Sequence, residues 1–219
     1  METRIKDIVS YLETASDDVC MIGIWRIGGG GKITLARAIF DQISFQFEGK
    51  SFIENVREVS SVPLSGLKLL RKQVLSHILY DQGINISSVS EGKNMLWRMM
   101  RARKALSGER NWFKSGSTII ITTRDKQVLV AHGVKLIHNV NLLSDKEATC
   151  LFSKYVYGRE IPIQGYEELL TQVVHYVLGL PLTIIVLGLF LCAKDEVEWI
   201  DALERLKTIP LMETQKNWN

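Results

Sequence analysis

The stretch from Met21 to Phe40, MIGIWRIGGGGKITLARAIF, limits the possible fold more than any other part of the sequence. An apolar run at 19–25 predicts a short buried strand. Four glycines and Lys32 follow it, and apolar residues then recur at helical spacing. These are the parts of a phosphate-binding loop, whose backbone N–H groups and lysine contact phosphate oxygens. The stretch therefore predicts a phosphate site between a strand and a helix.

Two residues depart from the usual form of this loop, G-x-x-x-x-G-K-[ST]. Arg26 replaces the leading glycine and adds a side chain where the strand turns sharply. Ile33 replaces the hydroxyl residue that holds Mg²⁺, and Thr34 is rotated from that position by about 100° around the helix. We expect a loop that can cradle phosphate but has a weakened Mg²⁺ site. The alternative is a glycine-rich turn that binds no ligand.

The pattern of strands and helices changes along the chain. Up to residue 141 strands alternate with helices, which predicts an α/β domain with a mainly parallel sheet. Beyond residue 141 the pattern is helical, and Ser144 with Glu147 forms a capping-box pair at the start of the first helix. The predicted strands are 19–25, 51–59, 117–125 and 134–140, and the predicted helices are 3–14, 33–47, 64–81, 92–106, 145–157, 164–177, 182–193 and 196–207.

We accordingly divide the chain into four parts. Residues 1–18 form an N-terminal linker helix, and residues 19–141 form the subdomain with the phosphate loop. Residues 142–211 form a helical subdomain, and residues 212–219 are a polar tail.

Composition excludes several classes of function. With 46% hydrophobic and 23% charged residues the chain is globular, and a net charge of +3 gives no argument for nucleic acid. Three dispersed cysteines fit a reducing, cytoplasmic compartment and no metal site. The N-terminus lacks the apolar core of a signal peptide. Residues 176–193 carry no charge, but Pro181 interrupts them, so we expect a buried helix and no membrane span.

A basic run at residues 93–104 is compatible with a nucleic-acid surface or with a solvated helix face. It contains Lys93, Arg98, Arg101, Arg103 and Lys104. A solvated helix face is the preferred interpretation, so no nucleic-acid partner is expected.

Three further stretches accompany the glycine-rich loop. In order along the chain the four are IGIWRIGGGGKITLARAIF, FKSGSTIIITTRD, LLSDKEATCLFSKYVYG and GLPLTIIVLG. Together they resemble the NB-ARC nucleotide-binding domain of plant disease-resistance proteins, most closely the type that follows a TIR domain (TIR-NBS-LRR). The resemblance extends over about residues 3–211.

The resemblance implies a fold, a ligand and roles for individual residues. The fold is a P-loop NTPase-like parallel sheet with flanking helices, followed by a small helical ARC1-like subdomain. Lys32 is implied to be the phosphate lysine, Arg124 the sensor of the γ-phosphate and Pro181 a neighbour of the adenine base. Thr122 and Thr123 end the strand that presents the arginine. The implied nucleotide-binding residues are Gly28, Gly29, Gly30, Gly31, Lys32, Ile33, Thr34, Arg124 and Pro181.

One element of the family is missing from the sequence. The resemblance places a hydrophobic strand ending in two aspartates, the Walker B element, between the strands at 51–59 and 117–125. No such run occurs between residues 92 and 117, which indicates an internal deletion near residues 104–108. The sequence also shows no winged-helix part, MHD element or leucine-rich repeats. Without a hydroxyl at position 33 or an aspartate to hold Mg²⁺, most hydrolysis should be lost.

The function implied by the resemblance is that of a switch domain, ADP-bound at rest and ATP-bound when signalling. For this chain we expect ADP or ATP binding with little or no hydrolysis, no catalytic residue and doubtful Mg²⁺ binding. Other resistance-protein domains are the other expected partners. The alternatives are an interaction or decoy fragment that needs no nucleotide, a true ATPase, and a pseudogene product that folds poorly.

Overall fold

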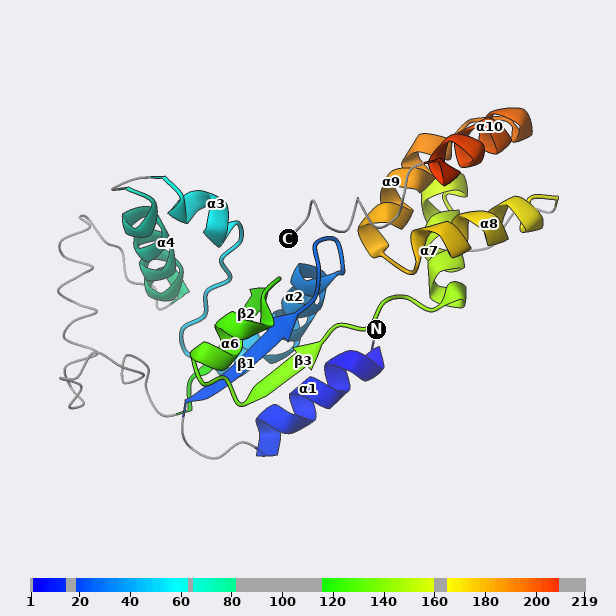
Figure 1. The fold of residues 1–219 in the computed structure, drawn as a ribbon. Helices are drawn as coiled ribbons and strands as arrows, with labels where there is room; N and C mark the ends of the chain where they lie inside the picture. The colour runs from blue at the N-terminus through cyan, green and yellow to red at the C-terminus, as the bar shows by residue number, and fades with distance from the viewer. Residues whose placement is uncertain (1, 15–18, 63–64, 82–115, 160–164, 209–219) are drawn as a thin grey trace, which may run out of the picture. The chain divides into compact units, whose positions relative to one another are not determined.

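The computed structural model describes residues 2–14, 19–62, 65–81, 116–159 and 165–208 (Figure 1). The chain divides into two compact units, which are described separately. One unit comprises Met1–Met21 and Leu35–Ile119, and the other comprises Ile22–Thr34 and Ile120–Asn219. The predicted helix at 92–106, its basic residues and the expected deletion near 104–108 lie outside the described residues.

A three-stranded parallel sheet is formed by β1 (Cys20–Trp25), β2 (Thr118–Thr123) and β3 (Leu136–Asn139), in the order β2-β1-β3. β1 pairs with β3 in a register that sets Ile22 opposite Leu136 and Trp25 opposite Asn139. β1 and β2 run in the same direction. One hydrogen bond joins their starts, from Cys20 N to Ser117 O (2.9 Å), and another joins their ends, from Arg26 N to Thr123 O (3.3 Å). The predicted strands at 19–25, 117–125 and 134–140 are therefore confirmed.

The central strand β1 is buried, as its apolar sequence predicts. Ile22 and Ile24 are both 0% exposed. Gly23 lies between them because the side chain of Leu129, from helix α6 (Lys126–Ala131), occupies the space that a Cβ would need. Since the three strands are parallel and the first is central, their carboxyl ends lie along one edge of the sheet, where α/β proteins bind ligands.

The predicted strand at 51–59 is wrong. Residues 51–55 are irregular, and Val56–Ser60 forms the short helix α3. Asn55 adopts the left-handed conformation (φ 54°), which ends an extended run. A strand also needs a neighbour for its N–H and C=O groups. The family resemblance implies that a strand between residues 92 and 117 would be this neighbour. The sequence has no hydrophobic run ending in aspartates there.

Helices are present where they were predicted at 3–14, 33–47 and 64–81, and each has buried apolar residues. Helix α1 spans Glu2–Thr14, α2 spans Lys32–Ile43, the 3-10 helix η1 spans Ser44–Gln46 and α4 spans Gly66–Asp81. Their buried residues include Ile8, Leu35, Ala36, Ile39, Ile43 and Leu70.

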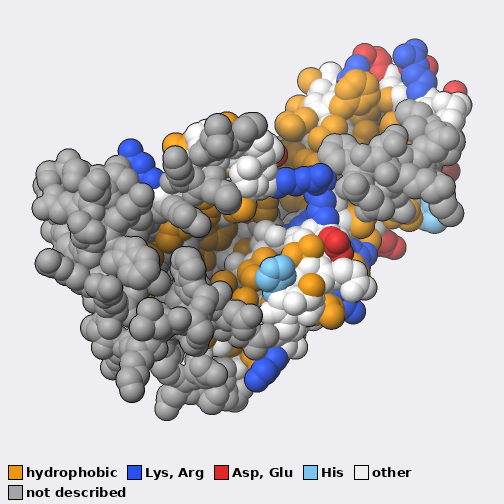
Figure 2. All heavy atoms as spheres, turned by 60° about the vertical axis from the view of Figure 1, so that its left-hand side comes forward, with side chains coloured by type: hydrophobic (Ala, Val, Ile, Leu, Met, Phe, Trp, Pro, Cys, Tyr) orange, Lys and Arg blue, Asp and Glu red, His pale blue; other side chains and the backbone are white. Residues whose placement is uncertain are grey.

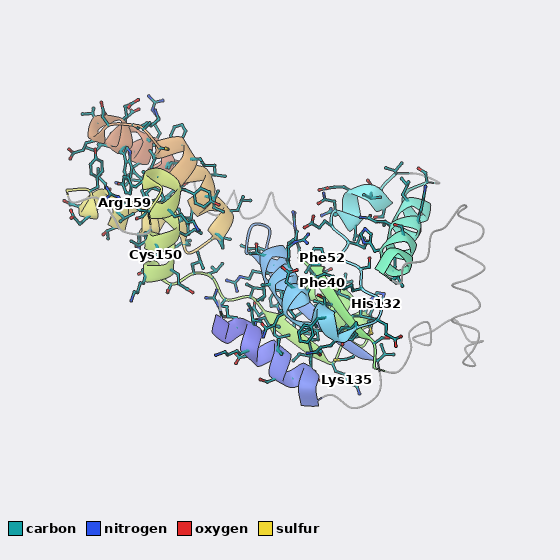
Figure 3. The ribbon with its side chains drawn as sticks, turned by 180° about the vertical axis from the view of Figure 1, so that it is seen from behind. Phe40, Phe52, His132, Lys135, Cys150 and Arg159 are labelled. Carbon is teal, nitrogen blue, oxygen red and sulfur yellow. The ribbon has the colours of Figure 1, made fainter. Side chains whose placement is uncertain are left out.

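A contact of Phe52 stabilises the irregular segment before α3. The rings of Phe40 and Phe52 meet edge to face at 5.4 Å (Figure 3). The Arg37 guanidinium lies 3.9 Å from the Phe52 ring centroid and forms an ion pair with Glu54 at 2.7 Å. Aromatic contact thus holds this segment where no strand ladder does.

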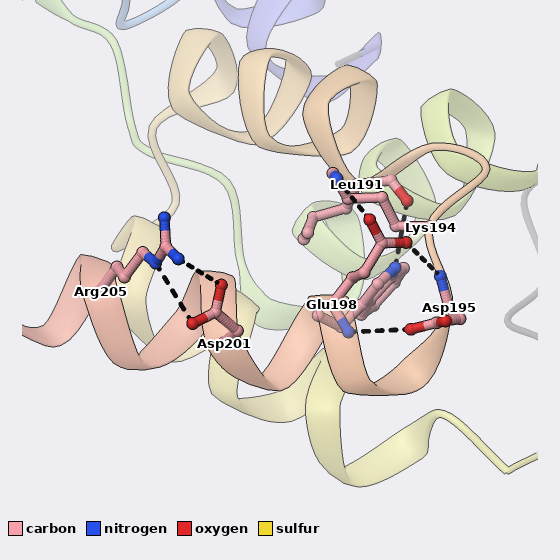
Figure 4. Close-up of polar contacts among 7 residues, drawn as sticks. Leu191, Lys194, Asp195, Glu198, Asp201 and Arg205 are labelled. Atoms are coloured by element: carbon pink, nitrogen blue, oxygen red, sulfur yellow. Dashed lines mark hydrogen bonds and ion pairs between the residues drawn. The ribbon is translucent and has the colours of Figure 1, made fainter.

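Four helices make up the predicted helical part: α7 (Asp145–Tyr157), α8 (Glu167–Val177), α9 (Pro181–Leu191) and α10 (Glu196–Lys207). The capping box of Ser144 and Glu147 is present at the start of α7, and Asp195 with Glu198 forms a second one at α10 (Figure 4). These caps satisfy N–H groups that a helix start leaves without intrahelical partners.

The helical part has one apolar core, centred on aromatic rings. Trp199 is 1% exposed, and its Nε1–H donates to the Leu191 carbonyl at 3.1 Å (Figure 4). The Trp199 ring contacts Phe152 edge to face at 5.6 Å. The buried residues of this core are Ala148, Phe152, Val156, Leu169, Leu170, Val173, Val174, Val177, Ile184, Leu187, Leu191, Trp199, Ala202 and Leu203.

The uncharged stretch at 176–193 is interrupted as predicted. α8 ends at Val177, Leu178 and Gly179 adopt positive φ angles, and α9 starts at Pro181. Among the described residues, none of the helices is long and apolar enough to cross a membrane.

Candidate functional site

The glycine-rich loop joins β1 to α2 and depends on glycine at two positions. Gly29 and Gly31 have φ angles of 72° and 80°, which L-residues rarely adopt. Gly30 N donates to the Ile27 carbonyl at 3.4 Å and closes a turn in the loop. Helix α2 starts at Lys32, so its N-terminal N–H groups lie directly after the loop. A helix start with preceding glycines favours an anion.

Lys32 is buried in this loop. Its side chain is 9% exposed, and Nζ donates to the Ile27 carbonyl at 2.9 Å. Burial lowers the pKa of Lys32 from its ordinary value, and the nearby positive charge of Arg124 lowers it further. An anion beside both groups would reverse this effect, because it favours the charged form of the lysine.

Arg124 reaches the same loop from the carboxyl end of β2. Its Cζ lies 3.4 Å from the position that a Cβ on Gly28 would take, so the guanidinium lies against the loop. The next residue, Asp125, caps α6 by accepting a hydrogen bond from Gln127 N at 2.8 Å. Two cationic side chains, Lys32 and Arg124, meet at one loop.

The GLPL stretch also contacts the loop. Leu182 N donates to the Gly29 carbonyl at 3.2 Å, and Pro181 Cγ lies 3.7 Å from the position of a Cβ on Gly31. Pro181 occupies the first turn of α9, where its missing N–H costs nothing. Sequence reasoning identified Pro181 but missed Leu182, whose contact is made by a backbone N–H at a helix start.

The two departures from the usual loop have different outcomes. Arg26 is accommodated: its Nη1 donates to Asn139 Oδ1 at 3.2 Å, at the end of β3. Its stem lies beside Gly30, where a Cβ would come within 2.6 Å of Arg26 Cγ. Ile33, in contrast, is 48% exposed and has no side-chain oxygen, and Thr34 is exposed as well.

Comparison with known proteins assigns the family. The sequence profile described as "NB-ARC domain" matches residues 1–161. The chain belongs to the NB-ARC family. Nucleotide binding is a general property of NB-ARC domains.

Relatives of this NB-ARC chain are plant disease-resistance proteins. Disease resistance protein RPV1 of Vitis rotundifolia is 36% identical over 99% of the chain, which spans 16% of that protein. TMV resistance protein N of Nicotiana glutinosa is 34% identical over 94% of the chain, and RPP4 of Arabidopsis thaliana is 36% identical over 94%. The chain spans 19% of each of these two proteins.

The relatives also contain residues that this NB-ARC chain lacks. The alignment with the Vitis protein runs over 232 residues, more than the 219 residues of this chain. Some positions of the alignment therefore have no counterpart in this chain.

The residues of this NB-ARC loop fit a phosphate group but not Mg²⁺. Backbone N–H groups, Lys32 and Arg124 suit phosphate oxygens. Mg²⁺ requires oxygen ligands, and Ile33 provides none at the position next to Lys32. The described part of the chain contains no group of three or more His, Cys, Asp or Glu side chains that could hold a metal ion.

Proposed function

We propose that this NB-ARC domain binds ADP or ATP at the glycine loop and hydrolyses it slowly or not at all. The proposed binding residues are Gly28, Gly29, Gly30, Gly31, Lys32, Ile33, Thr34, Arg124 and Pro181. The meeting of Lys32 and Arg124 at a loop with two positive-φ glycines carries the proposal. ADP is favoured over ATP because it demands less charge neutralisation by Mg²⁺.

The proposed domain organisation follows the sequence. Residues 19–141 carry the phosphate loop, and residues 142–211 form the helical subdomain that supplies Pro181. The hydrogen bond from Leu182 N to Gly29 O supports a role for α9 in sensing the loop. We place the protein in the cytoplasm, as a switch domain in plant disease resistance.

A thermal-shift experiment tests nucleotide binding. ADP at millimolar concentration should raise the melting temperature of the wild-type chain, because a ligand that binds only the folded state stabilises it. Lys32→Ala should abolish the rise, while Lys194→Ala, which removes a half-buried lysine paired with Glu198 in the helical part, should preserve it. No shift in the wild-type protein would refute the proposal.

A phosphate-release assay tests the lack of hydrolysis. Release from ATP in the presence of Mg²⁺ should not exceed that of Lys32→Ala, because Ile33 cannot hold the metal. Release well above that control would establish a true ATPase and contradict this part of the proposal.

A second candidate function is an interaction or decoy role for the helical part. Figure 2 shows hydrophobic side chains gathered on the surface of this part of the molecule. In α9, four exposed apolar residues follow helical spacing: Leu182 (46% exposed), Val186 (55%), Leu189 (60%) and Phe190 (55%). An exposed apolar stripe of this kind is typical of an interaction surface.

The two candidates differ in their dependence on nucleotide. Association with a full-length resistance protein should survive Lys32→Ala and be lost in Val186→Glu if α9 is the contact surface. Loss of association in Lys32→Ala would favour the nucleotide-dependent function instead. Circular dichroism and sedimentation of the same samples distinguish either function from a product that folds poorly.

A further inference from the structure

Arg26 hydrogen-bonds to residues at the ends of both neighbouring strands, although a phosphate loop usually has glycine at this position. The residue follows directly after β1, which ends at Trp25. Its backbone N–H donates to Thr123 O at the carboxyl end of β2 at 3.3 Å, and its side chain reaches the end of β3. There Asn139 Oδ1 accepts a hydrogen bond from Arg26 Nη1 at 3.2 Å. Asn139 is uncharged, so this bond positions the guanidinium without neutralising it.

The stem of Arg26 follows the loop. A Cβ on Gly30 would lie 2.6 Å from Arg26 Cγ and 3.2 Å from its Cβ. The absence of a side chain at Gly30 thus makes room for the arginine, and these two positions fit each other. The bond to Asn139 uses one of the five N–H donors that a guanidinium carries.

A nucleotide bound at this loop would meet less positive charge than at a loop that also holds Mg²⁺. Mg²⁺ normally neutralises part of the charge on a bound di- or triphosphate, and the residue at position 33 offers it no oxygen. A guanidinium keeps its charge at all working pH values and binds phosphate through two parallel N–H groups.

We propose that Arg26 contacts the phosphates of bound ADP or ATP and takes the place of Mg²⁺ in neutralising them. Nucleotide binding by this loop is then independent of the metal. This inference rests on the proposed nucleotide-binding function and adds to it the residue that supplies the missing charge.

Titration calorimetry with ADP and with inorganic pyrophosphate, each in EDTA and in Mg²⁺, tests the inference. The wild-type dissociation constants should agree within about twofold between the two conditions, a free-energy difference below that of one hydrogen bond. Arg26→Gln keeps most of the stem and a hydrogen-bond donor but removes the charge. It should weaken both ligands by about tenfold or more, as expected for the loss of a hydrogen bond to a charged group.

Control variants separate charge from packing and from folding. Arg205→Gln removes an exposed arginine from α10 and should leave both dissociation constants unchanged. Unfolding midpoints measured on every variant identify any loss that follows from instability. Wild-type affinity in a folded Arg26→Gln protein, or an affinity that rises tenfold with Mg²⁺ in the wild type, would overturn the inference alone. Absence of ADP binding by the wild-type protein would overturn the proposed function and this inference with it.

Discussion

Three glycines with nearly the same φ angle allow the effect of close packing to be measured. Gly158, Gly29 and Gly179 have φ angles of 69°, 72° and 70°. A Cβ on Gly158 would meet nothing within 4 Å, whereas on Gly29 it would lie 2.9 Å from Leu182 Cβ. On Gly179 it would collide with the backbone carbonyl of Leu143 and lie 3.1 Å from the backbone N of that residue. Alanine at these positions therefore has the same conformational cost and a different steric cost.

The magnitudes follow from these contacts. An L-residue in the left-handed conformation costs about 1–2 kcal/mol, which is the whole effect expected for Gly158→Ala. Overpacking adds about 1–3 kcal/mol, so Gly179→Ala should cost about 2–5 kcal/mol in the free energy of unfolding. Gly29→Ala should fall between them, because the side chain of Leu182 can shift and a backbone carbonyl cannot. Alanine also restricts the unfolded chain equally at all three positions, so this contribution cancels in the differences.

Urea unfolding followed by tryptophan fluorescence provides the measurement, since Trp199 lies in the core of the helical part. The expected order of destabilisation is Gly158→Ala, then Gly29→Ala, then Gly179→Ala. A Gly179→Ala protein as stable as Gly158→Ala would refute the contact between the GLPL stretch and Leu143. Such a result would also weaken the case that this stretch is held close to the loop.

Three further predictions concern single side chains. Gly30→Ala should lower the free energy of unfolding by about 1–3 kcal/mol in the wild type, since the new methyl meets the Arg26 stem. The loss should be much smaller in an Arg26→Gly background, and a double-mutant cycle measures this coupling. Trp199→Ala should destabilise the protein by about 3–5 kcal/mol in urea unfolding and Trp199→Phe by less, although both leave the Leu191 carbonyl without its donor. Because the pKa of Lys32 is lowered, its ammonium loses a proton at a lower pH than an ordinary lysine does. ADP affinity should therefore fall at alkaline pH in a pH series of titrations. Lys32→Arg should remove this fall, because arginine keeps its charge.

The elements that follow from local pattern could be predicted from the sequence. The apolar run at 19–25 gives β1, and the capping box of Ser144 and Glu147 marks the start of α7. The strand predicted at 51–59 shows the limit of this approach. Its residues have a strand-like composition, but a strand also depends on a partner elsewhere in the chain, and local sequence carries no information about that partner.

The candidate site could be predicted in part for a similar reason. Lys32, Arg124 and Pro181 were identified because side-chain type or the resemblance indicated them, and all three lie at the loop. The link from Leu182 to Gly29 is made by backbone atoms, which every residue carries, so no sequence pattern identifies it. Arg26 was interpreted only as a departure from the motif, because its partner Asn139 is distant in sequence.

The hydrogen bond from Lys32 Nζ to the Ile27 carbonyl holds the ammonium inside the loop before any ligand arrives. An ammonium carries three N–H donors, so one bond to a carbonyl leaves two donors for an anion. The entropy cost of ordering a long lysine side chain, about 1.5–2 kcal/mol, is then incurred on folding and does not weaken binding. Since the acceptor is a backbone carbonyl, substitution of the Ile27 side chain leaves this preorganisation in place.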